Sequence, residues 1–120
     1  MIFDLFNVMV FISKYLIPKG YNGLTIFPFI FLKRKALKQD SVLVNHERIH
    51  LKQQLELFVL AFYLCYFIEF LIRLIRYKNW NKAYKNISFE REAYSNEFNL
   101  EYLESRPIWA FLKYLRSHEI

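Results

Sequence analysis

Two histidines and a glutamate stand at a spacing that is typical of a metal site. They form the motif His46-Glu47-Arg48-Ile49-His50. Four residues are just over one helical turn, so both imidazoles project from the same helix face and can share one tetrahedral ion. Glu47 is placed to reach a water bound to that ion and to remove its proton. The pattern therefore predicts a Zn²⁺ site with hydrolytic chemistry.

A catalytic zinc site usually takes three protein ligands and leaves a fourth position to water, so a third ligand must be found. The best source is the segment 88–94, where Glu90 follows His50 by 40 residues (90 − 50) and Glu92 comes two later. We choose Glu90 and hold Glu92 in reserve, since residues two apart point to different helix faces. An acidic helix N-terminus would explain both without a metal. We expect His118, in the C-terminal tail, to be non-functional, or else a reserve ligand.

The two motifs together resemble the gluzincin pattern of zinc metallopeptidases, an outline shared by small bacterial HExxH proteins and integral-membrane CaaX-type peptidases. The first motif is followed by Gln53, and the second reads Phe89-Glu90-Arg91-Glu92-Ala93. The similarity covers roughly residues 25–96. It implies a helical, zincin-like minimal domain that hydrolyses peptide bonds, with Glu90 as the ligand glutamate.

One position departs from that pattern. Such peptidases commonly carry an aspartate four residues after the ligand glutamate, where it supports a metal-binding histidine, and this chain has Tyr94 there. The Tyr94 hydroxyl could accept a histidine N–H or donate to a developing oxyanion, which makes it a catalytic candidate beside Glu47; a packing role is the alternative. Gln53 or Gln54 could instead support a histidine, or could be solvated.

The elements that must position these residues are predicted to be mostly helical. Apolar residues make up 55% of the chain and only two glycines are present, which favours long helices in one domain over residues 1–120, of mainly α (α+β) class. Residues 1–17 read as a short helix or strand and 18–23 as a tight reversal. Residues 24–32, with Pro28, read as an edge strand, so we expect a short edge strand or hairpin before the HExxH helix. Asp40 or Ser41 can cap the helix that begins near Val42.

The second half of the chain is also predicted to be helical. Residues 55–77 are apolar on every side, but the uninterrupted run 57–68 is short for a bilayer span, so we expect a buried core helix or an interfacial helix. A polar break follows at 77–81. Ser88 can cap a helix from Phe89 to Ser105, ended by Pro107, and 108–115 form a last amphipathic helix.

Charge and composition narrow the classes of partner. The net charge of +6 comes without any nucleic-acid-binding signature, so we expect no nucleic acid, and a membrane surface is the preferred acidic partner. Cys65 is expected to be a small core residue. The first 17 residues lack a basic n-region and a cleavage site, which predicts a cytoplasmic protein, with peripheral association at the inner face of the membrane left open.

Three functions remain in competition. The first is a zinc-dependent peptidase in which Glu47 is the general base and the strand at 25–32 aligns a peptide or protein substrate. The second is a catalytically inactive zinc-binding or membrane-surface module with a degenerate metallopeptidase fold, which the small size favours. The third is a helical membrane protein without zinc.

Overall fold

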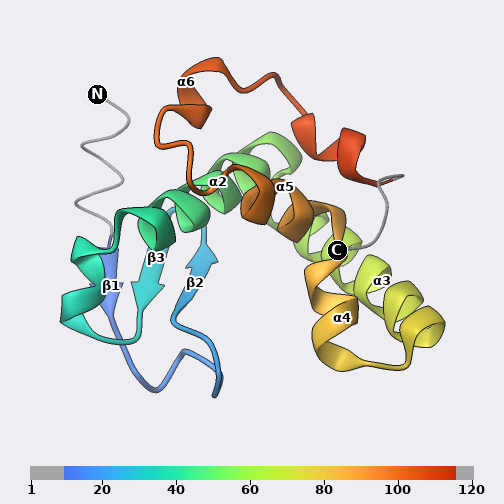
Figure 1. Cartoon of the computed structure of the whole chain (residues 1–120), viewed down its shortest axis with the longest axis horizontal. Helices are drawn as coiled ribbons and strands as arrows, with labels where there is room; N and C mark the ends of the chain where they lie inside the picture. Colours follow the sequence, from blue (N-terminus) through green and yellow to red (C-terminus); the bar gives the residue numbers. More distant parts are fainter. Residues whose placement is uncertain (1–9, 116–120) are drawn as a thin grey trace.

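A small sheet and a set of helices surround one long central helix in the computed structural model, which describes residues 10–115 (Figure 1). The prediction of a mainly α (α+β) fold with a short edge strand or hairpin before the HExxH helix is confirmed. The sheet has three strands in the order β1-β3-β2. Its strands are β1 (Val10–Ile12), β2 (Gly23–Ile26) and β3 (Phe29–Leu32).

The apolar run 24–32 folds as a hairpin and not as the single strand that its composition suggested. Strands β2 and β3 are antiparallel with Thr25 opposite Ile30, while β1 pairs with β3 in parallel. The chain reverses at Phe27-Pro28, whose peptide bond is cis. Proline has no N–H to give to a ladder, so it suits the turn better than a strand interior. Strand β2 lies at an edge of the sheet and, among the described residues, pairs only with β3.

Helix α2 (Ser41–Leu57) carries the HExxH motif across the sheet. Asp40, one of the two predicted caps, accepts the Leu43 N–H at 3.1 Å and so satisfies one of the unpaired donors of the first turn. The 3₁₀ helix η1 (Lys35–Gln39) leads into it. Leu51 of α2 packs with buried side chains of β3 and η1, namely Ile30, Leu32 and Leu37. This cluster fixes α2 against the sheet.

A sharp bend separates α2 from α3 (Val59–Tyr77), where the sequence predicted one continuous helix from residue 55. Phe58 adopts a left-handed φ of 59°, and the two helix axes turn by 110°. Phe62 of α3 is buried, but many other side chains of this helix are exposed to solvent, so the prediction of a buried core helix is wrong for its outer side. The prediction that Cys65 is a core residue is also wrong, because Cys65 is exposed. Among the described residues, no single helix has the length and apolar character to cross a bilayer, and α2 with α3 meet those criteria only as a bent pair.

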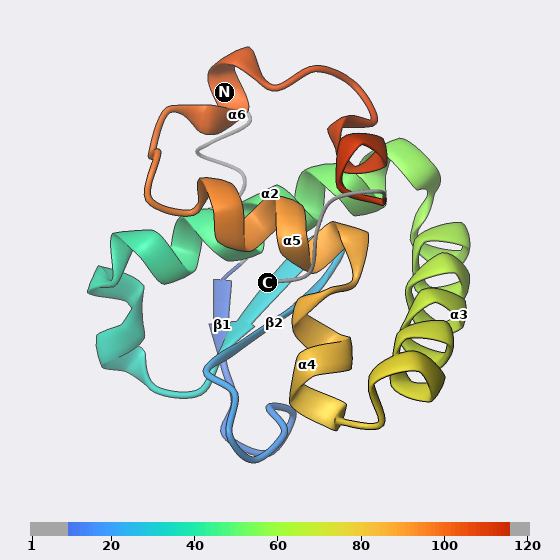
Figure 2. The ribbon, with the colours of Figure 1, turned by 45° about the vertical axis from the view of Figure 1, so that its right-hand side comes forward.

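Helices α4 (Trp80–Lys85) and α5 (Ser88–Asn96) return the chain to α2, and α4 was not anticipated from the sequence. Figure 2 shows α5 lying alongside α2, with α3 and α4 packed together on the side away from β1. Ser88 does not cap α5 with its own oxygen as predicted. Instead its N–H and hydroxyl both donate to the Glu69 carboxylate, at 2.5 and 2.7 Å. A carboxylate at a helix N-terminus is favoured by the helix dipole.

The helix predicted for residues 89–105 is interrupted after Asn96. The Asn45 side chain on α2 donates to the backbone carbonyls of Asn96, Glu97 and Asn99, at 3.4, 2.9 and 3.0 Å. These carbonyls are thus satisfied without a continuing helix. The chain then forms α6 (Tyr102–Ser105) and the 3₁₀ helix η2 (Ala110–Tyr114), which is shorter than the amphipathic helix predicted there.

The two faces of α3 should differ sharply in their contribution to stability. Phe62 is 2% exposed in a cluster with Ile87, Phe89 and Phe111, whereas Leu60 on the same helix is 85% exposed. We expect Phe62→Ala to lower the free energy of unfolding by about 3–5 kcal/mol, because it leaves a cavity in this cluster. Leu60→Ala should change it by less than about 0.5 kcal/mol. Urea denaturation measures both, and equal losses would contradict this packing.

Candidate metal centre

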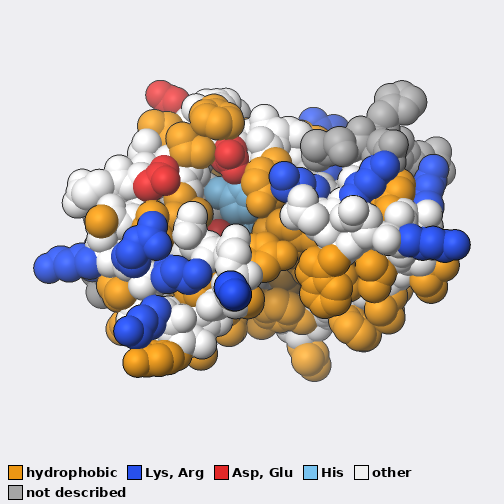
Figure 3. All heavy atoms as spheres, turned by 60° about the horizontal axis from the view of Figure 1, so that its bottom comes forward, with side chains coloured by type: hydrophobic (Ala, Val, Ile, Leu, Met, Phe, Trp, Pro, Cys, Tyr) orange, Lys and Arg blue, Asp and Glu red, His pale blue; other side chains and the backbone are white. Residues whose placement is uncertain are grey.

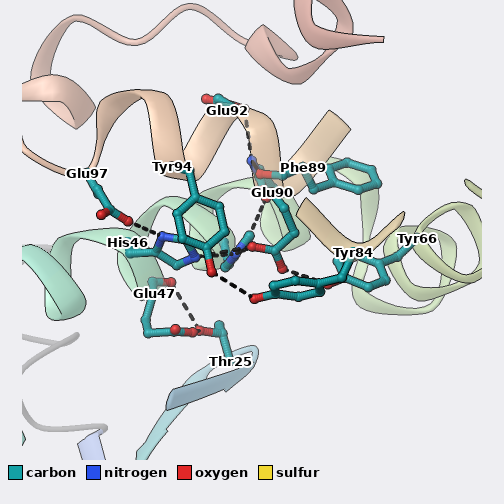
Figure 4. A network of polar contacts seen from close by, with 12 residues as sticks. Thr25, His46, Glu47, Tyr66, Tyr84, Phe89, Glu90, Glu92, Tyr94 and Glu97 are labelled. Carbon is teal, nitrogen blue, oxygen red and sulfur yellow. Dashed lines mark hydrogen bonds and ion pairs between the residues drawn. The ribbon is translucent and has the colours of Figure 1, made fainter. Parts of the chain in front are cut away.

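Three of the predicted residues meet at one point. The Nε2 atoms of His46 and His50 are 3.2 Å apart, and Glu90 Oε1 lies 3.2 Å from the first and 3.1 Å from the second. All three side chains are buried, the histidines on α2 and Glu90 on α5 (Figure 4). Within residues 10–115 they form a group able to hold a metal ion.

The shape of this triangle suits a small tetrahedral ion. Zinc bonds of about 2.0–2.1 Å to nitrogen and oxygen place neighbouring tetrahedral ligands about 3.3–3.4 Å apart. The three edges found here, 3.1 to 3.2 Å, are close to that value. Two imidazoles and one carboxylate are also ligands that zinc accepts in catalytic sites, where the fourth position is left to water.

The tautomer of His50 is fixed by Gln53, one of the two glutamines considered as supports. The Gln53 amide donates through Nε2 to the Phe89 carbonyl at 3.1 Å and to Glu92 Oε1 at 2.9 Å. Its Oε1 therefore faces His50 Nδ1, at 2.8 Å, and accepts a hydrogen bond from the Nδ1–H. With the proton on Nδ1, the neutral ring directs its Nε2 lone pair at the meeting point.

His46 is oriented in the same way by Glu97, which the sequence did not suggest. Its Nδ1 lies 2.7 Å from Glu97 Oε1, so Nδ1–H donates to the carboxylate and Nε2 again offers a lone pair. The supporting acid expected four residues after Glu90 is thus found seven residues after it (97 − 90). Seven residues are two helical turns, so Glu97, which directly follows α5 with a helical backbone, lies on the same side of this helix as Glu90.

The third ligand candidate, Glu90, is held by Tyr66 of α3. The Tyr66 hydroxyl donates to Glu90 Oε2 at 2.6 Å, which leaves Oε1 to face the two histidines. Burial, together with the nearby Glu90 charge, raises the pKa of Tyr66 well above its ordinary value, so the hydroxyl keeps its proton. Each of the three converging groups therefore has a partner behind it.

The electrostatics of the meeting point favour positive charge. Burial by itself lowers the pKa of His46, but hydrogen bonds to Glu90 and Glu97 outweigh it and raise the pKa to about 10. Burial by itself would raise the pKa of Glu90, but the two nearby histidines lower this pKa below its ordinary value. A proton on one imidazole occupies the lone pair of that ring only. A divalent cation can accept lone pairs from both imidazoles and from the Glu90 carboxylate at once.

Glu92, the reserve ligand, faces away from the histidines. It is buried on the opposite side of α5, where it accepts from Tyr102 at 2.7 Å and is paired with the Arg106 guanidinium. Arg106 also binds Glu56 of α2, at 2.7 Å. The structure thus agrees with the argument from spacing that only one of the two glutamates can bind the ion. Glu92 instead links α5 to residues 102–106.

Glu47, the predicted general base, lies between the histidines and the open edge of the sheet. The Thr25 hydroxyl contacts Glu47 Oε1 at 2.6 Å and the Glu47 carbonyl at 3.1 Å, which ties α2 to β2. Gly23 leaves the space that this carboxylate fills, because a β-carbon there would lie only 3.0 Å from Glu47 Oε2. The carboxylate is therefore positioned by two residues of β2.

Tyr94, the other catalytic candidate, lies against the site without replacing the missing aspartate. Its ring packs edge-to-face on His46 with centroids 4.5 Å apart, and its hydroxyl is 3.4 Å from that of Tyr84. The His46 N–H is directed to Glu97 instead. Burial raises the pKa of Tyr94 to about 12, so it is a proton donor and not a base at neutral pH. His118 lies outside the described residues.

Two cavities flank Glu47. The larger, about 450 Å³, is lined by Glu47, His50 and Glu90 at one end and by aromatic side chains such as Phe62, Phe70 and Trp80 beyond them. The smaller, about 270 Å³, is lined by His46, Glu47, Tyr94 and Glu97. Figure 3 shows histidine atoms at the bottom of a hollow that opens on this face. A bound chain could therefore extend to both sides of the metal position.

Several residues of the site were not identified from the sequence. Tyr66 and Glu97 belong to neither motif, and Gly23 and Thr25 were placed only in a turn and a strand. The spacing of Glu97 from Glu90 was a usable signal, because two turns of helix separate them. Nothing in the sequence indicated Tyr66, since α3 contains many aromatic residues and only its bend against α2 selects this one.

Comparison with known proteins adds no relative. No protein-family model matches the chain, and neither a curated protein nor a solved structure matches it. The resemblance to gluzincins therefore rests on the two motifs alone. The geometry above shows that the buried group of His46, His50 and Glu90 could bind a metal ion.

Separate substitutions of the two glutamates of α5 should distinguish a metal-binding role from a structural role. Loss of a residue that only supports a metal ligand weakens metal binding by about 10- to 100-fold. Glu90→Gln removes a ligand itself, so we expect it to weaken zinc binding by more than that. Glu92→Gln should leave zinc binding within about 10-fold, but should destabilise the fold by about 3–5 kcal/mol, because it breaks a buried ion pair. Metal analysis and urea denaturation of both variants check this, and loss of zinc from the Glu92 variant alone would contradict the assignment.

Proposed function

We propose that this protein is a zinc-dependent hydrolase that cleaves peptide bonds, in the manner that gluzincin-like motifs imply. The observation that carries the proposal is that three buried acceptors, on His46, His50 and Glu90, converge at zinc-like spacing next to Glu47. A site built only for structure needs no carboxylate beside it that is not a ligand, and it commonly has four protein ligands. Here the described ligand group has three.

Glu47 would act as general base and then as proton donor. Zinc, when bound, acidifies a water ligand and polarises the scissile carbonyl. Glu47 Oε1 accepts from Thr25, and its Oε2 faces Gly23 at the wall of both cavities. This oxygen can take a proton from the attacking water and pass it to the leaving amine. Thr25 keeps the carboxylate in place through both transfers.

The open edge of β2 would align the substrate. The Asn22 carbonyl accepts from the Lys33 N–H, so the backbone groups of Asn22 face β3. Because these groups alternate in direction along a strand, those of Leu24 also face β3, and those of Gly23 and Thr25 face the open edge. The Thr25 carbonyl is occupied by Gln54 and Tyr63. Gly23 is left to offer its N–H and carbonyl to an extended peptide lying across Glu47. The aromatic cavity would then take a large apolar side chain of that peptide.

A second candidate is a metal site that stabilises the fold without catalysis. It is favoured by the tight hydrogen bond between Thr25 and Glu47, which makes this carboxylate a bridge between α2 and β2 whatever else it does. Such a protein would lose stability on chelation and would show no hydrolysis of any peptide. Cleavage of a fluorogenic peptide library by the zinc-loaded protein decides between the two candidates.

Replacing the proposed base should separate metal binding from chemistry. Glu47→Gln keeps the side-chain length and an oxygen that can accept from Thr25, so the variant should bind zinc as the parent does. It cannot take a proton, so we expect turnover to fall by about 10²- to 10⁴-fold. Zinc content and peptide cleavage, measured side by side, provide the test. Full activity in this variant would show that Glu47 is not the base.

A methyl group at position 23 should displace the base without touching the metal. The added carbon of Gly23→Ala would lie 3.0 to 3.2 Å from three atoms of the Glu47 side chain. Since small misplacements at a reacting centre cost up to about 100-fold, we expect turnover to fall by about 10- to 100-fold with unchanged zinc content. Unaltered turnover with intact zinc would mean that Glu47 does not act from its observed position.

A further inference from the structure

Helix α3 presents an apolar face to the outside of the protein as well as one to the core. Its outward residues recur at helical spacing and are between 49% and 85% exposed; they are Leu60, Leu64, Ile68, Ile72 and Ile75. A soluble surface helix ordinarily turns charged or polar residues outward at these positions. Contiguous exposed apolar surface of this kind marks an interaction site.

The opposite face of α3 is already engaged and cannot turn outward. Phe62 is buried in the core, Tyr66 donates to Glu90, and Phe70 packs on Trp80 with centroids 4.8 Å apart. The outer face therefore needs a partner that comes to it. Figure 3 shows hydrophobic side chains gathered beside the histidine hollow on the α3 and α4 side of the molecule, with Lys and Arg along their margin.

The segment that carries this face is predominantly basic. The segment 58–87 contains five basic residues, Arg73, Arg76, Lys78, Lys82 and Lys85, and a single acid. That acid, Glu69, is turned inward to Ser88 and Arg73. Arg76 and Lys78 at the end of α3 are exposed, as is Trp80 at the start of α4. Basic residues and tryptophan next to an apolar helix face are typical of helices that lie at a lipid headgroup layer.

An anionic bilayer fits this surface better than a second copy of the chain. A second copy would offer these basic residues no acid from its own outer face of α3, because Glu69 is turned inward, whereas anionic headgroups offer the complementary charge. Insertion of α3 as a span is disfavoured, because its inner face holds the core and no single described helix meets the requirements for crossing. We propose that the outer face of α3 docks onto the surface of an anionic membrane.

This proposal does not depend on the proposed hydrolase function, since it rests on surface residues away from the metal centre. It is tested by flotation with vesicles of phosphatidylcholine alone and of phosphatidylcholine mixed with phosphatidylserine. We expect binding to the mixed vesicles, weakened by salt because basic side chains contribute to it. The pair Arg76→Gln and Lys78→Gln should weaken binding about 10-fold or more, at roughly 1 kcal/mol per basic residue near the surface.

The apolar contribution is tested with matched pairs of substitutions. Leu64→Glu with Ile75→Glu places two acids on the outer face, whereas Phe98→Glu with Leu100→Glu places two on exposed apolar positions of the segment between α5 and α6. The first pair should abolish flotation and the second should leave at least half of it, with circular dichroism confirming that both fold. All four positions are at the surface, so folding should be retained.

Several outcomes would overturn the proposal. Equal flotation of the two pairs would mean that α3 is not the contact. Retention on the vesicles after an alkaline carbonate wash would indicate an integral protein instead of a surface-bound one. Dimerisation measured by light scattering that the α3 pair abolishes, with no vesicle binding by the parent, would assign this face to a second copy of the chain.

Discussion

Three buried hydrogen-bond acceptors that face one another are the constraint on which the site depends. Gln53 and Glu97 fix the protons of the two histidines on Nδ1, so both Nε2 lone pairs and the Glu90 carboxylate point to one place. Lone pairs at this separation repel unless a positive charge lies between them. A cation held there would therefore join α2 to α5, and the metal centre and the packing of these helices become one feature.

The supports of the site are also the supports of the fold. Gln53 binds both His50 and the backbone of α5, and Glu92 continues that connection to Arg106. Asn45 ends α5 at the point where Glu97 can reach His46. Such sharing explains how the described residues can order a buried polar centre, because each side chain that supports the site is itself held by a hydrogen-bond partner.

Helix α3 gives the protein two different surfaces from one apolar stretch. Its inner aromatic residues hold Glu90 and line the larger cavity, while its outer aliphatic residues are exposed. The bend at Phe58 creates this division, because it turns α3 away from the line of α2 so that only one side of α3 meets the core. Under the two proposals above, one side of α3 would serve the site and the other would serve the membrane surface.

Local spacing and capping were enough to predict the fold class, an N-cap of α2 at Asp40 or Ser41, and both imidazoles on one helix face. The sequence also selected Glu90, through a motif. Three features came only from the folded structure: the break at Phe58, the end of α5 at Asn96 and the hydrogen bonds of Glu97 and Tyr66 to the site. These depend on contacts between residues far apart in the chain, and local propensity and periodicity carry no information about such contacts.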